Sequence, residues 1–532
     1  MDRKLPIGIQ SFEKIRHDRF VYVDKTAHVW RMVREGAPCF LSRPRRFGKS
    51  LLVSTLRAYF EGRRDLFAGL AIERLEEDAA RAEGRDPWTA RPVFHLDFNG
   101  ADYTREGGLE AKLEALLRSL EEAWGDDWRD LQPSGRFQNL IERAHAQSGH
   151  RVVVLVDEYD KPLLETMDNP DLEERNRSAL KGFYSVLKGS DEHLRFVLLT
   201  GVTKFSKVSI FSDLNQLRDI SLERDYAGVC GITEEELLRD FGPELDALAT
   251  QLGMDANACL DALRAQYDGY CFHPDGPGAP DSMVYNPFSL LNALQSRRLG
   301  SYWFQTGTPT FLARRMREVE LDPRRLTDGS IRATDRRLSD YRADDPDPVP
   351  LLYQAGYLTI RDADPRTARY ALAVPNGEVR YGLVESLLPV WAPGYEESRG
   401  TDVFALLDYV EAGDTDGMRR LLEALFASIP YTRADDPFEN YFQAVLWLVF
   451  TMLGRYVTCE LHQATGRMDV LIETAGHVYV MELKRDGTAA EALAQIEQHG
   501  YAKPFAADAR QLHLIGCAFD SATRQLADWE AR

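Results

Sequence analysis

The segment from Arg43 to Ser50 contains residue types that could bind phosphate. Gly48, Lys49 and Ser50 directly precede a helical pattern. Backbone N–H groups at the start of a helix can wrap phosphate oxygens, and the helix dipole favours negative charge there. In a Walker A loop, Lys49 would reach the β- and γ-phosphates of a nucleotide and the Ser50 hydroxyl would bind Mg²⁺. This segment therefore predicts a phosphate-binding loop.

The loop departs from the usual pattern at its first position. Where G-x-x-x-x-G-K-S has a glycine, this sequence has Arg43. Either the chain enters the loop differently, or Arg43 itself contacts phosphate, as Arg46 could also do. A Gly-Lys-Ser tripeptide alone would equally fit a charged loop that caps a helix.

An apolar run ending in two acids supplies the partner that such a loop needs. Val152–Val156 is continuously apolar, as expected for a strand buried on both faces, and Asp157 and Glu158 follow it. Ligands bind at the carboxyl ends of parallel strands. We expect Asp157 to hold Mg²⁺ through water and Glu158 to polarise the attacking water, which is the Walker B arrangement. Together with the loop, the pair favours a nucleotide site over an acidic strand cap.

Thr200 follows another apolar strand candidate and has two interpretations of equal weight. It could sense the γ-phosphate, or it could satisfy backbone groups at the strand end. The complete set of predicted nucleotide-binding residues is Arg43, Arg46, Gly48, Lys49, Ser50, Leu51, Asp157 and Thr200.

A second group of charged residues lies near the C-terminus. Asp469 lies inside one predicted strand, and Glu482 and Lys484 lie in the next. Since Glu482 and Lys484 are two positions apart, they point to the same face of their strand. An acid and a lysine on an inward face require a stabilising partner, and a divalent cation is one. Asp469 and Glu482 would bind Mg²⁺ or Mn²⁺, and Lys484 would position the nucleophilic water.

Two further residues could complete this site. Glu439 begins the preceding predicted helix and could be a third metal ligand, although it could also serve only as a partner of the helix dipole. Gln495 lies on the following helix and could touch substrate or the site lysine. The alternative for Glu482 and Lys484 is an exposed salt bridge on an edge strand, which would contribute little stability.

Strand and helix patterns alternate through the N-terminal part, which predicts a parallel sheet with right-handed crossovers. The strand candidates are Cys39–Leu41, Val93–Phe98, Val152–Val156 and Leu194–Leu199. The helix candidates are Lys49–Phe60, Leu109–Trp124, Phe137–Ala146 and Glu173–Leu187.

The pattern changes after about residue 230. Thr233 and Glu236 form a capping-box pair that opens a mostly helical stretch. A helix-then-strand stretch from Leu326 to Trp391 suggests a small winged-helix-like module. We therefore predict four parts: a nucleotide-binding α/β core at 1–230, a helical lid at 231–325, a winged-helix-like connector at 326–400, and an α/β nuclease-like domain at 401–532.

Composition limits the cellular setting. The 532 residues carry a net charge of −19, which argues against a histone-like coat on nucleic acid but not against a local basic groove. The six cysteines contain no CxxC pair and fit reduced thiols. The first residues lack the apolar region of a signal peptide, and no apolar run is long enough to span a membrane. We therefore expect a cytoplasmic protein without a membrane partner.

The motifs together resemble the prokaryotic AAA-ATPase-like proteins, which commonly carry a C-terminal PD-(D/E)XK nuclease-superfamily domain. The resemblance covers nearly the whole chain, and the basic loop around Arg43 is specific to that family. The matching segments are Leu5–Gly8, Tyr22–Thr26, Arg43–Ser50, Asp157–Pro162, Thr200–Thr203, Tyr267–Tyr270, Tyr285–Phe288, Gly466–Asp469, Glu482–Lys484 and Gln495–Ile496.

The resemblance implies two active sites. One binds ATP and Mg²⁺ at Lys49, Ser50, Asp157 and Glu158. The other is a nuclease-like core that contains Glu439, Asp469, Glu482 and Lys484. A role in mobile-element biology or phage defence follows only by analogy.

Two functions fit these observations. The first is an ATPase coupled to a metal-dependent nuclease that acts on nucleic acid, with DNA favoured over RNA. The second is a regulatory or sensing ATPase whose C-terminal domain binds nucleic acid or protein without cutting. Nucleotide sites of this class often lie at subunit interfaces, which raises a homo-oligomer as a further expectation. The sequence leaves open the strandedness of the substrate, the oligomeric state and the trigger of the ATPase.

Overall fold

The structure is a computed structural model. It describes residues 3–125, 131–204, 217–279, 282–304, 310–319, 321–339, 347–391, 403–427, 441–454, 458–461, 469–523 and 525–532. The chain forms two compact units. The first comprises Met1–Trp303 and Gly329–Glu378, and the second comprises Phe304–Asp328 and Val379–Arg532.

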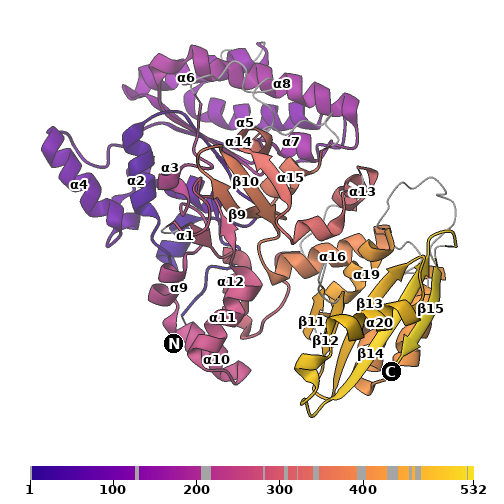
Figure 1. Cartoon of the computed structure of the whole chain (residues 1–532). Helices are drawn as coiled ribbons and strands as arrows, with labels where there is room; N and C mark the ends of the chain where they lie inside the picture. The colour runs from indigo at the N-terminus through magenta and orange to yellow at the C-terminus, as the bar shows by residue number, and fades with distance from the viewer. Residues whose placement is uncertain are drawn as a thin grey trace. The chain divides into compact units, whose positions relative to one another are not determined.

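A five-stranded parallel sheet forms the centre of the first unit (Figure 1). Its strands lie in the order β2-β3-β4-β1-β5. Strand β4 pairs on one side with β3 and on the other with β1. The predicted α/β fold with a parallel sheet is confirmed. The strand bounds are β1 Cys39–Ser42, β2 Val93–Asp97, β3 Val152–Asp157, β4 Leu194–Gly201 and β5 Arg218–Asp219.

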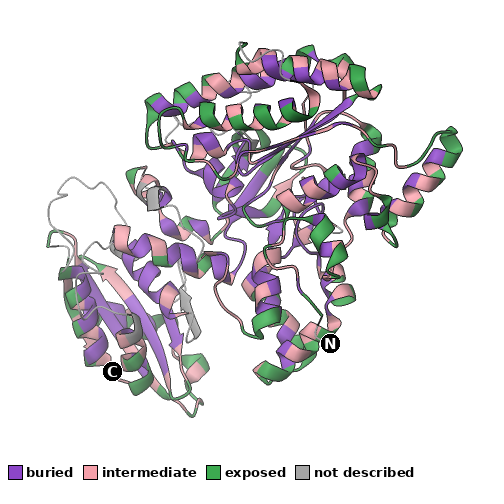
Figure 2. Cartoon of the chain, turned by 180° about the vertical axis from the view of Figure 1, so that it is seen from behind, coloured by how far each residue is buried: buried purple, intermediate pink, exposed green. Residues whose placement is uncertain are grey.

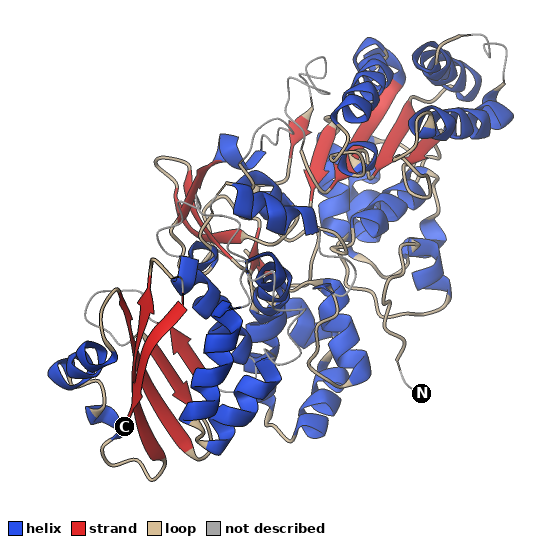
Figure 3. Cartoon of the chain, turned by 90° about the vertical axis from the view of Figure 1, so that its right-hand side faces the viewer, coloured by secondary structure: helices blue, strands red, loops and turns tan. Residues whose placement is uncertain are grey.

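Helices lie on both sides of this sheet, as Figure 3 shows. Helix α3 packs against β3 and β2, and α6 packs against β3 while also contacting α5 and α8. Strand β3 is buried along its whole length, as its continuous apolar run predicts. The helix bounds are α1 Phe12–His17, α2 Thr26–Glu35, α3 Lys49–Phe60, α4 Ala71–Glu83, α5 Gly108–Trp124, α6 Pro133–Ser148, α7 Lys161–Leu164 and α8 Pro170–Gly189.

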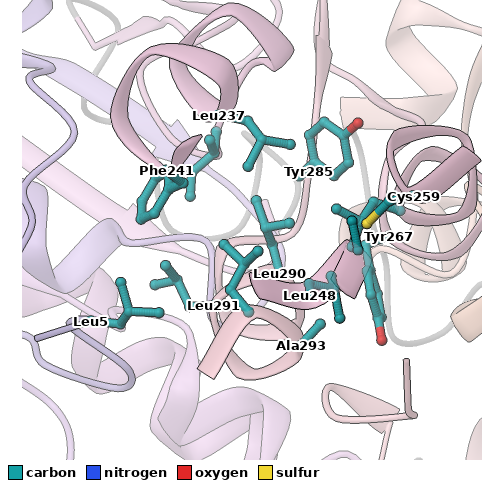
Figure 4. Packing of buried hydrophobic residues seen from close by; sticks show 14 residues of the cluster. Leu5, Leu237, Phe241, Leu248, Cys259, Tyr267, Tyr285, Leu290, Leu291 and Ala293 are labelled. Carbon is teal, nitrogen blue, oxygen red and sulfur yellow. The ribbon is translucent and has the colours of Figure 1, made fainter. Parts of the chain in front are cut away.

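Four helices after the sheet pack around a shared apolar cluster (Figure 4). Leu237, Leu248, Leu263 and Leu290 come one from each helix, and Leu5 joins them from the N-terminal segment. The predicted capping box at the start of α9 is present. This is the helical region expected after the core. The bounds are α9 Glu234–Asp240, α10 Gly242–Leu252, α11 Ala256–Tyr267 and α12 Pro287–Ser296.

A small antiparallel sheet completes the first unit. Its order is β8-β10-β9, and two short helices connect β8 to β9. Part of the region predicted to be winged-helix-like therefore consists of three strands with two helices between the first and the second. The bounds are β6 Tyr270–Cys271, β7 Met283–Val284, β8 Ile331–Thr334, α14 Asp335–Ser339, α15 Val349–Gln354, β9 Thr359–Asp364 and β10 Arg369–Ala373.

The second unit is built on a mixed five-stranded sheet in the order β11-β12-β13-β14-β15. Strands β13 and β14 are parallel and the other neighbours are antiparallel. Val480, Leu493 and Ile496 belong to the apolar cluster that joins α20 to the sheet. The bounds are α13 Thr310–Glu318, α16 Gly377–Trp391, α17 Val403–Ala412, α18 Thr415–Ala427, α19 Tyr441–Leu453, β11 Thr458–Leu461, β12 Val470–Glu473, β13 His477–Arg485, α20 Ala489–His499, β14 Gln511–Asp520 and β15 Gln525–Ala531.

Burial follows these layers in each unit. Figure 2 shows the sheet strands mostly buried, while the outer faces of the helices are exposed. Within the part of the chain that the structure describes, no helix is both long and apolar enough to cross a bilayer.

A buried ion pair joins α5 to α6. Arg136 Nε and Nη2 donate to the two carboxylate oxygens of Glu121 at 2.7 and 2.9 Å. Arg136→Ala would leave Glu121 buried without its cation and should lower the free energy of unfolding of this unit by about 3–5 kcal/mol, measured by chemical denaturation. Arg118→Ala, which removes an exposed pair with Glu114, is the control and should cost less than about 1 kcal/mol. Equal effects of the two substitutions would contradict this account.

Candidate functional site

The segment between β1 and α3 has the backbone shape of a phosphate loop. Gly48 caps α3 with a φ of 96°, and Arg46 has a φ of 66°. A Cβ placed on Gly48 would meet no atom within 4 Å, so the backbone conformation, rather than crowding, explains the glycine. Lys49 and Ser50 begin the helix, so their N–H groups lie at its positive end. Leu51 follows in the same first turn.

The Lys49 side chain is buried inside this loop. Its Nζ donates to the carbonyl oxygens of Arg43 and Pro44 at 2.8 and 3.0 Å, and the residue is 6% exposed. Burial lowers the pKa of Lys49, while the charges of Asp157 and Glu158 oppose that shift. The structure therefore brings the predicted phosphate-binding lysine and the two acids after β3 into one electrostatic neighbourhood.

Thr200 lies beside the first of these acids because β4 runs next to β3. The Thr200 hydroxyl donates to Asp157 Oδ1 at 2.8 Å and also lies 3.3 Å from the Val156 carbonyl oxygen. On the other side of β4, Thr200 pairs with Leu41 of β1. Its hydroxyl thus reaches both a backbone carbonyl and the carboxylate predicted to hold the metal through water.

Glu158 stands at the exit of β3 with a φ of 52°, a left-handed conformation that is uncommon for a residue other than glycine. Its carboxylate lies 3.5 Å from Lys161 Nζ, which also donates to Asn99 Oδ1 at 2.8 Å. Glu158 is therefore held at the carboxyl end of the sheet, where a ligand of this fold would bind.

Arg43 makes its bonds within the protein. Nη1 donates to the carbonyl oxygens of Ser42 and Ser221 at 2.9 and 2.8 Å, and Nη2 donates to that of Tyr226 at 2.9 Å. The guanidinium also lies 4.1 Å from the centre of the Phe272 ring. The residue that replaces the first glycine thus ties the loop entrance to two distant segments of the same unit.

Arg46 has a different environment. Its guanidinium lies 4.0 Å from the centre of the Phe288 ring, on α12 of the helical region. A second contact joins the loop to the segment that follows α12, because Trp303 Nε1 donates to the Arg45 carbonyl oxygen at 3.1 Å. The basic loop is therefore in contact with segments beyond the sheet.

The second unit brings Asp469, Glu482 and Lys484 together. Asp469 directly precedes β12, where Val470 pairs with Met481, so Asp469 lies opposite Glu482. The Leu483 N–H donates to Asp469 Oδ2 at 2.8 Å.

Gln495 of α20 lies between the acid and the lysine. Its Nε2 donates to Glu482 and its Oε1 accepts from Lys484. Lys484 Nζ lies 3.7 Å from Glu482 Oε1. Gln495 therefore contacts the site lysine, as the sequence analysis expected, and α20 fixes the spacing between Glu482 and Lys484.

Glu482 is only 2% exposed, on a strand with neighbours on both sides, so the edge-strand salt bridge does not describe it. Burial and, next in size, the charge of Asp469 raise the pKa of Glu482 to about 7, and Lys484 opposes the shift. Among the described residues, no donor reaches Glu482 Oε2. A buried carboxylate oxygen without a donor beside a second carboxylate fits a divalent cation.

Other parts of the predicted metal site are less complete. Glu439 lies outside the described residues. Within the described ranges, no group of three or more His, Cys, Asp or Glu side chains forms a metal-binding cluster. Asp469 and Glu482 are therefore the two predicted metal ligands that the described residues bring together.

Two residues near these sites were given no role by the sequence analysis. Asp160 is buried behind the β3 acids, and its charge acts on Lys49. It lies in the Asp157–Pro162 segment that carries the family resemblance, but no role was predicted for it. Tyr501 is buried beside the second site, where burial, followed by the charges of Glu482 and Asp469, raises its pKa. It follows α20 without a pattern that would have marked it.

Comparison with known proteins finds a family match in each half of the chain. Residues 6–211 match the family described as "Predicted AAA-ATPase", and residues 437–529 match the PD-(D/E)XK nuclease superfamily. A protein of Azotobacter chroococcum mcd 1, named "Uncharacterized protein in vnfD 5'region", is 40% identical over 98% of both chains. The chain belongs to the AAA-ATPase-like family and carries a C-terminal PD-(D/E)XK nuclease-superfamily domain.

A solved structure also resembles this AAA-ATPase-like protein. It is the Aeropyrum pernix ORC1 protein in complex with DNA, which is 13% identical, covers 68% of this chain and 91% of its own, and has a TM-score of 0.24. A likeness at that TM-score supports no conclusion about the fold or the partners of this chain. The family assignment comes from the two domain matches and the full-length relative.

The contacts of Arg43 in this AAA-ATPase-like protein give a prediction that separates its two interpretations. Arg43→Ala removes the donors to Ser42, Ser221 and Tyr226 and should lower the thermal unfolding midpoint of the first unit, because three carbonyls lose a hydrogen bond. Differential scanning calorimetry measures this shift, with Arg45→Ala as the matched control in the same loop. A loss of ATP affinity at an unchanged midpoint would instead show that Arg43 contacts phosphate.

Proposed function

We propose that this protein hydrolyses ATP with Mg²⁺ at the first site, and that this activity is coupled to metal-dependent cleavage of nucleic acid phosphodiester bonds at the second. DNA is the favoured substrate over RNA. The observation that carries the proposal is the grouping, in each unit, of a lysine with paired acids: Lys49 with Asp157 and Glu158, and Lys484 with Glu482 and Asp469.

At the first site, the bound magnesium nucleotide supplies the phosphate to be transferred and the metal that neutralises its charge. Lys49 would leave the carbonyls of Arg43 and Pro44 to bind phosphate oxygens. Ser50 and Asp157 would hold the metal, and Glu158 would orient the attacking water. The Thr200 hydroxyl keeps the Asp157 carboxylate in place and would respond to the γ-phosphate.

At the second site, a bound divalent cation supplies Lewis-acid activation and a water of lowered pKa. Asp469 and Glu482 would hold it through the oxygens that protein donors do not occupy. Lys484 would position the water and offset negative charge as the phosphodiester bond breaks. Gln495 fixes the distance between Lys484 and Glu482.

The place of these reactions in the cell is a further part of the proposal. A mobile-element or phage-defence role fits a protein that joins nucleotide hydrolysis to nucleic acid cleavage, and a homo-oligomer would fit a nucleotide site shared between subunits. The non-cutting alternative, in which the second site only binds, is an outcome of the experiments below.

The ATPase proposal is tested by Lys49→Ala. Loss of the ammonium removes the group that would bind the phosphates, and ATP turnover should fall at least about 100-fold. Phosphate release at saturating Mg²⁺ and ATP measures this. Lys188→Ala is the control, since that exposed lysine lies in the last turn of α8 and its loss should have a much smaller effect. Wild-type turnover in Lys49→Ala would refute the phosphate-loop assignment.

The nuclease proposal is tested by Asp469→Asn and Lys484→Ala. Each should reduce cleavage of plasmid DNA by roughly 100-fold or more, because each removes a group that acts on the metal or the water. Chelation of divalent cations should abolish cleavage, and added Mg²⁺ or Mn²⁺ should restore it.

The matched control for the nuclease experiment is Glu473→Gln. Glu473 lies at the other end of β12 and pairs with Arg510, away from the proposed metal ligands. It should cut DNA at the wild-type rate. Retained DNA binding with equal, trace cutting by the wild type and Asp469→Asn would favour the non-cutting alternative. RNA of the same sequence, tested in parallel, decides which nucleic acid is the substrate.

A further inference from the structure

Asp160 makes an unusual set of contacts for a buried acid. It lies three residues after Asp157 and is 1% exposed. Its Oδ2 accepts from the backbone N–H groups of Val202 and Thr203 at 2.9 and 2.6 Å, and from the Thr203 hydroxyl at 2.7 Å. A single carboxylate oxygen thus holds the segment that leaves β4.

The neighbouring residue strengthens the same junction. The Tyr159 N–H donates to the Thr200 carbonyl oxygen at 3.1 Å, and its hydroxyl donates to the Thr203 carbonyl oxygen at 2.9 Å. A Cβ on Gly201 would lie 2.5 Å from Asp160 Oδ1, so only glycine permits this close approach. Hydrogen bonds therefore join the residues that follow β3 to Thr200 and to the residues just after it.

The segment that follows β4 makes a further contact at Lys204. The Lys204 N–H donates to Gln354 Oε1 at 2.8 Å, and Gln354 Nε2 donates to the Leu338 carbonyl oxygen at 2.5 Å. Gln354 ends α15 and Leu338 lies in α14. The chain after Thr200 is thus held first by hydrogen bonds to Asp160 and then by a hydrogen bond to Gln354, at the end of α15.

A neutral side chain could join the ends of β3 and β4 at a lower cost in free energy, because burying a carboxylate is unfavourable even when it is hydrogen-bonded. Among the described residues, no donor reaches Asp160 Oδ1. The Asp160 charge opposes the lowering of the Lys49 pKa that burial in the phosphate loop causes. The acid therefore belongs to the electrostatics of the nucleotide site as well as to the strand junction.

We propose that Asp160 is a positioning residue for ATP hydrolysis, which holds Val202 and Thr203 so that the Thr200 hydroxyl stays on the Asp157 carboxylate. It touches neither nucleotide nor metal and acts through Thr200. This inference rests on the proposed ATPase function. It adds Asp160 to the nucleotide site. The hydrogen bonds between Asp160 and the residues after β4 would then determine the rate of ATP turnover rather than the affinity for nucleotide.

The test is Asp160→Asn, which keeps the shape of the side chain but removes its charge and so weakens the three hydrogen bonds that it accepts from Val202 and Thr203. A displaced Thr200 should lower kcat for ATP roughly 10- to 100-fold, since displacements of about 1 Å have effects of that size. KM and the affinity for a non-hydrolysable ATP analogue should stay within about 2-fold, because binding by Lys49 and the loop is retained. Glu165→Gln, which alters a surface carboxylate on the same segment, is the control and should match the wild type.

A second pair of variants covers the case in which Asp160→Asn does not fold. Thr203→Val removes one donor to Asp160 and keeps the two backbone donors, so kcat should fall by a smaller factor. Thr203→Ser restores the hydroxyl and should restore kcat. A merely structural role would change the unfolding midpoint without this pattern of loss and rescue.

The outcomes are distinguishable. Wild-type kcat in Asp160→Asn, or equal kcat in Thr203→Val and Thr203→Ser, would overturn the positioning role. A loss of nucleotide affinity equal to the loss of kcat would also overturn it, because Asp160 would then act on binding. Undiminished turnover in Lys49→Ala would instead refute the ATPase assignment on which the inference rests.

Discussion

The arrangement of the nucleotide site depends on the position of β4 between β1 and β3. Strand β1 leads into the phosphate loop, and β3 ends in Asp157. Because β4 pairs with both, Thr200 reaches Asp157 on one side while its neighbour in β1 is Leu41. This strand order therefore brings the loop, the acid and the hydroxyl together at the carboxyl edge of the sheet.

Three buried charged groups explain why the family motifs extend beyond the atoms that would touch ligands. Arg43 binds three backbone carbonyls, Asp160 binds donors at the exit of β4, and Glu482 is bridged to a lysine by a glutamine. Each burial is unfavourable unless the partners are placed well. These residues therefore hold segments in a required geometry, and a motif position can matter without contacting substrate.

In each unit, neighbouring strands of a sheet bring a lysine and two acids together. In the first, parallel strands bring chemical groups to one edge, where a helix begins with a positive end. In the second, adjacent antiparallel strands place Asp469 opposite Glu482, and α20 supplies Gln495. In both units the lysine is held by protein acceptors, the carbonyls of the loop for Lys49 and the Gln495 amide for Lys484.

The regular elements were largely predictable. The helix predicted over Lys49–Phe60 has those bounds, and the continuous apolar run of β3 is buried as expected. Strand β15 was missed because Gln525–Ala531 is an edge strand whose residues are all exposed or half-exposed, so neither alternation nor an apolar run marks it. The short β5 was missed because two residues carry no periodicity.

The sequence by itself determined the residue types, their order and the local shapes that they favour: a glycine before Lys49, an acid pair after a buried strand, and an acid and a lysine on one strand face. Only the tertiary structure decided what Arg43 and Asp160 do. Arg43 binds a carbonyl 183 positions away, and Asp160 binds donors about 40 positions away. Such contacts follow from how the strands and loops pack together, and local propensity and spacing do not encode them.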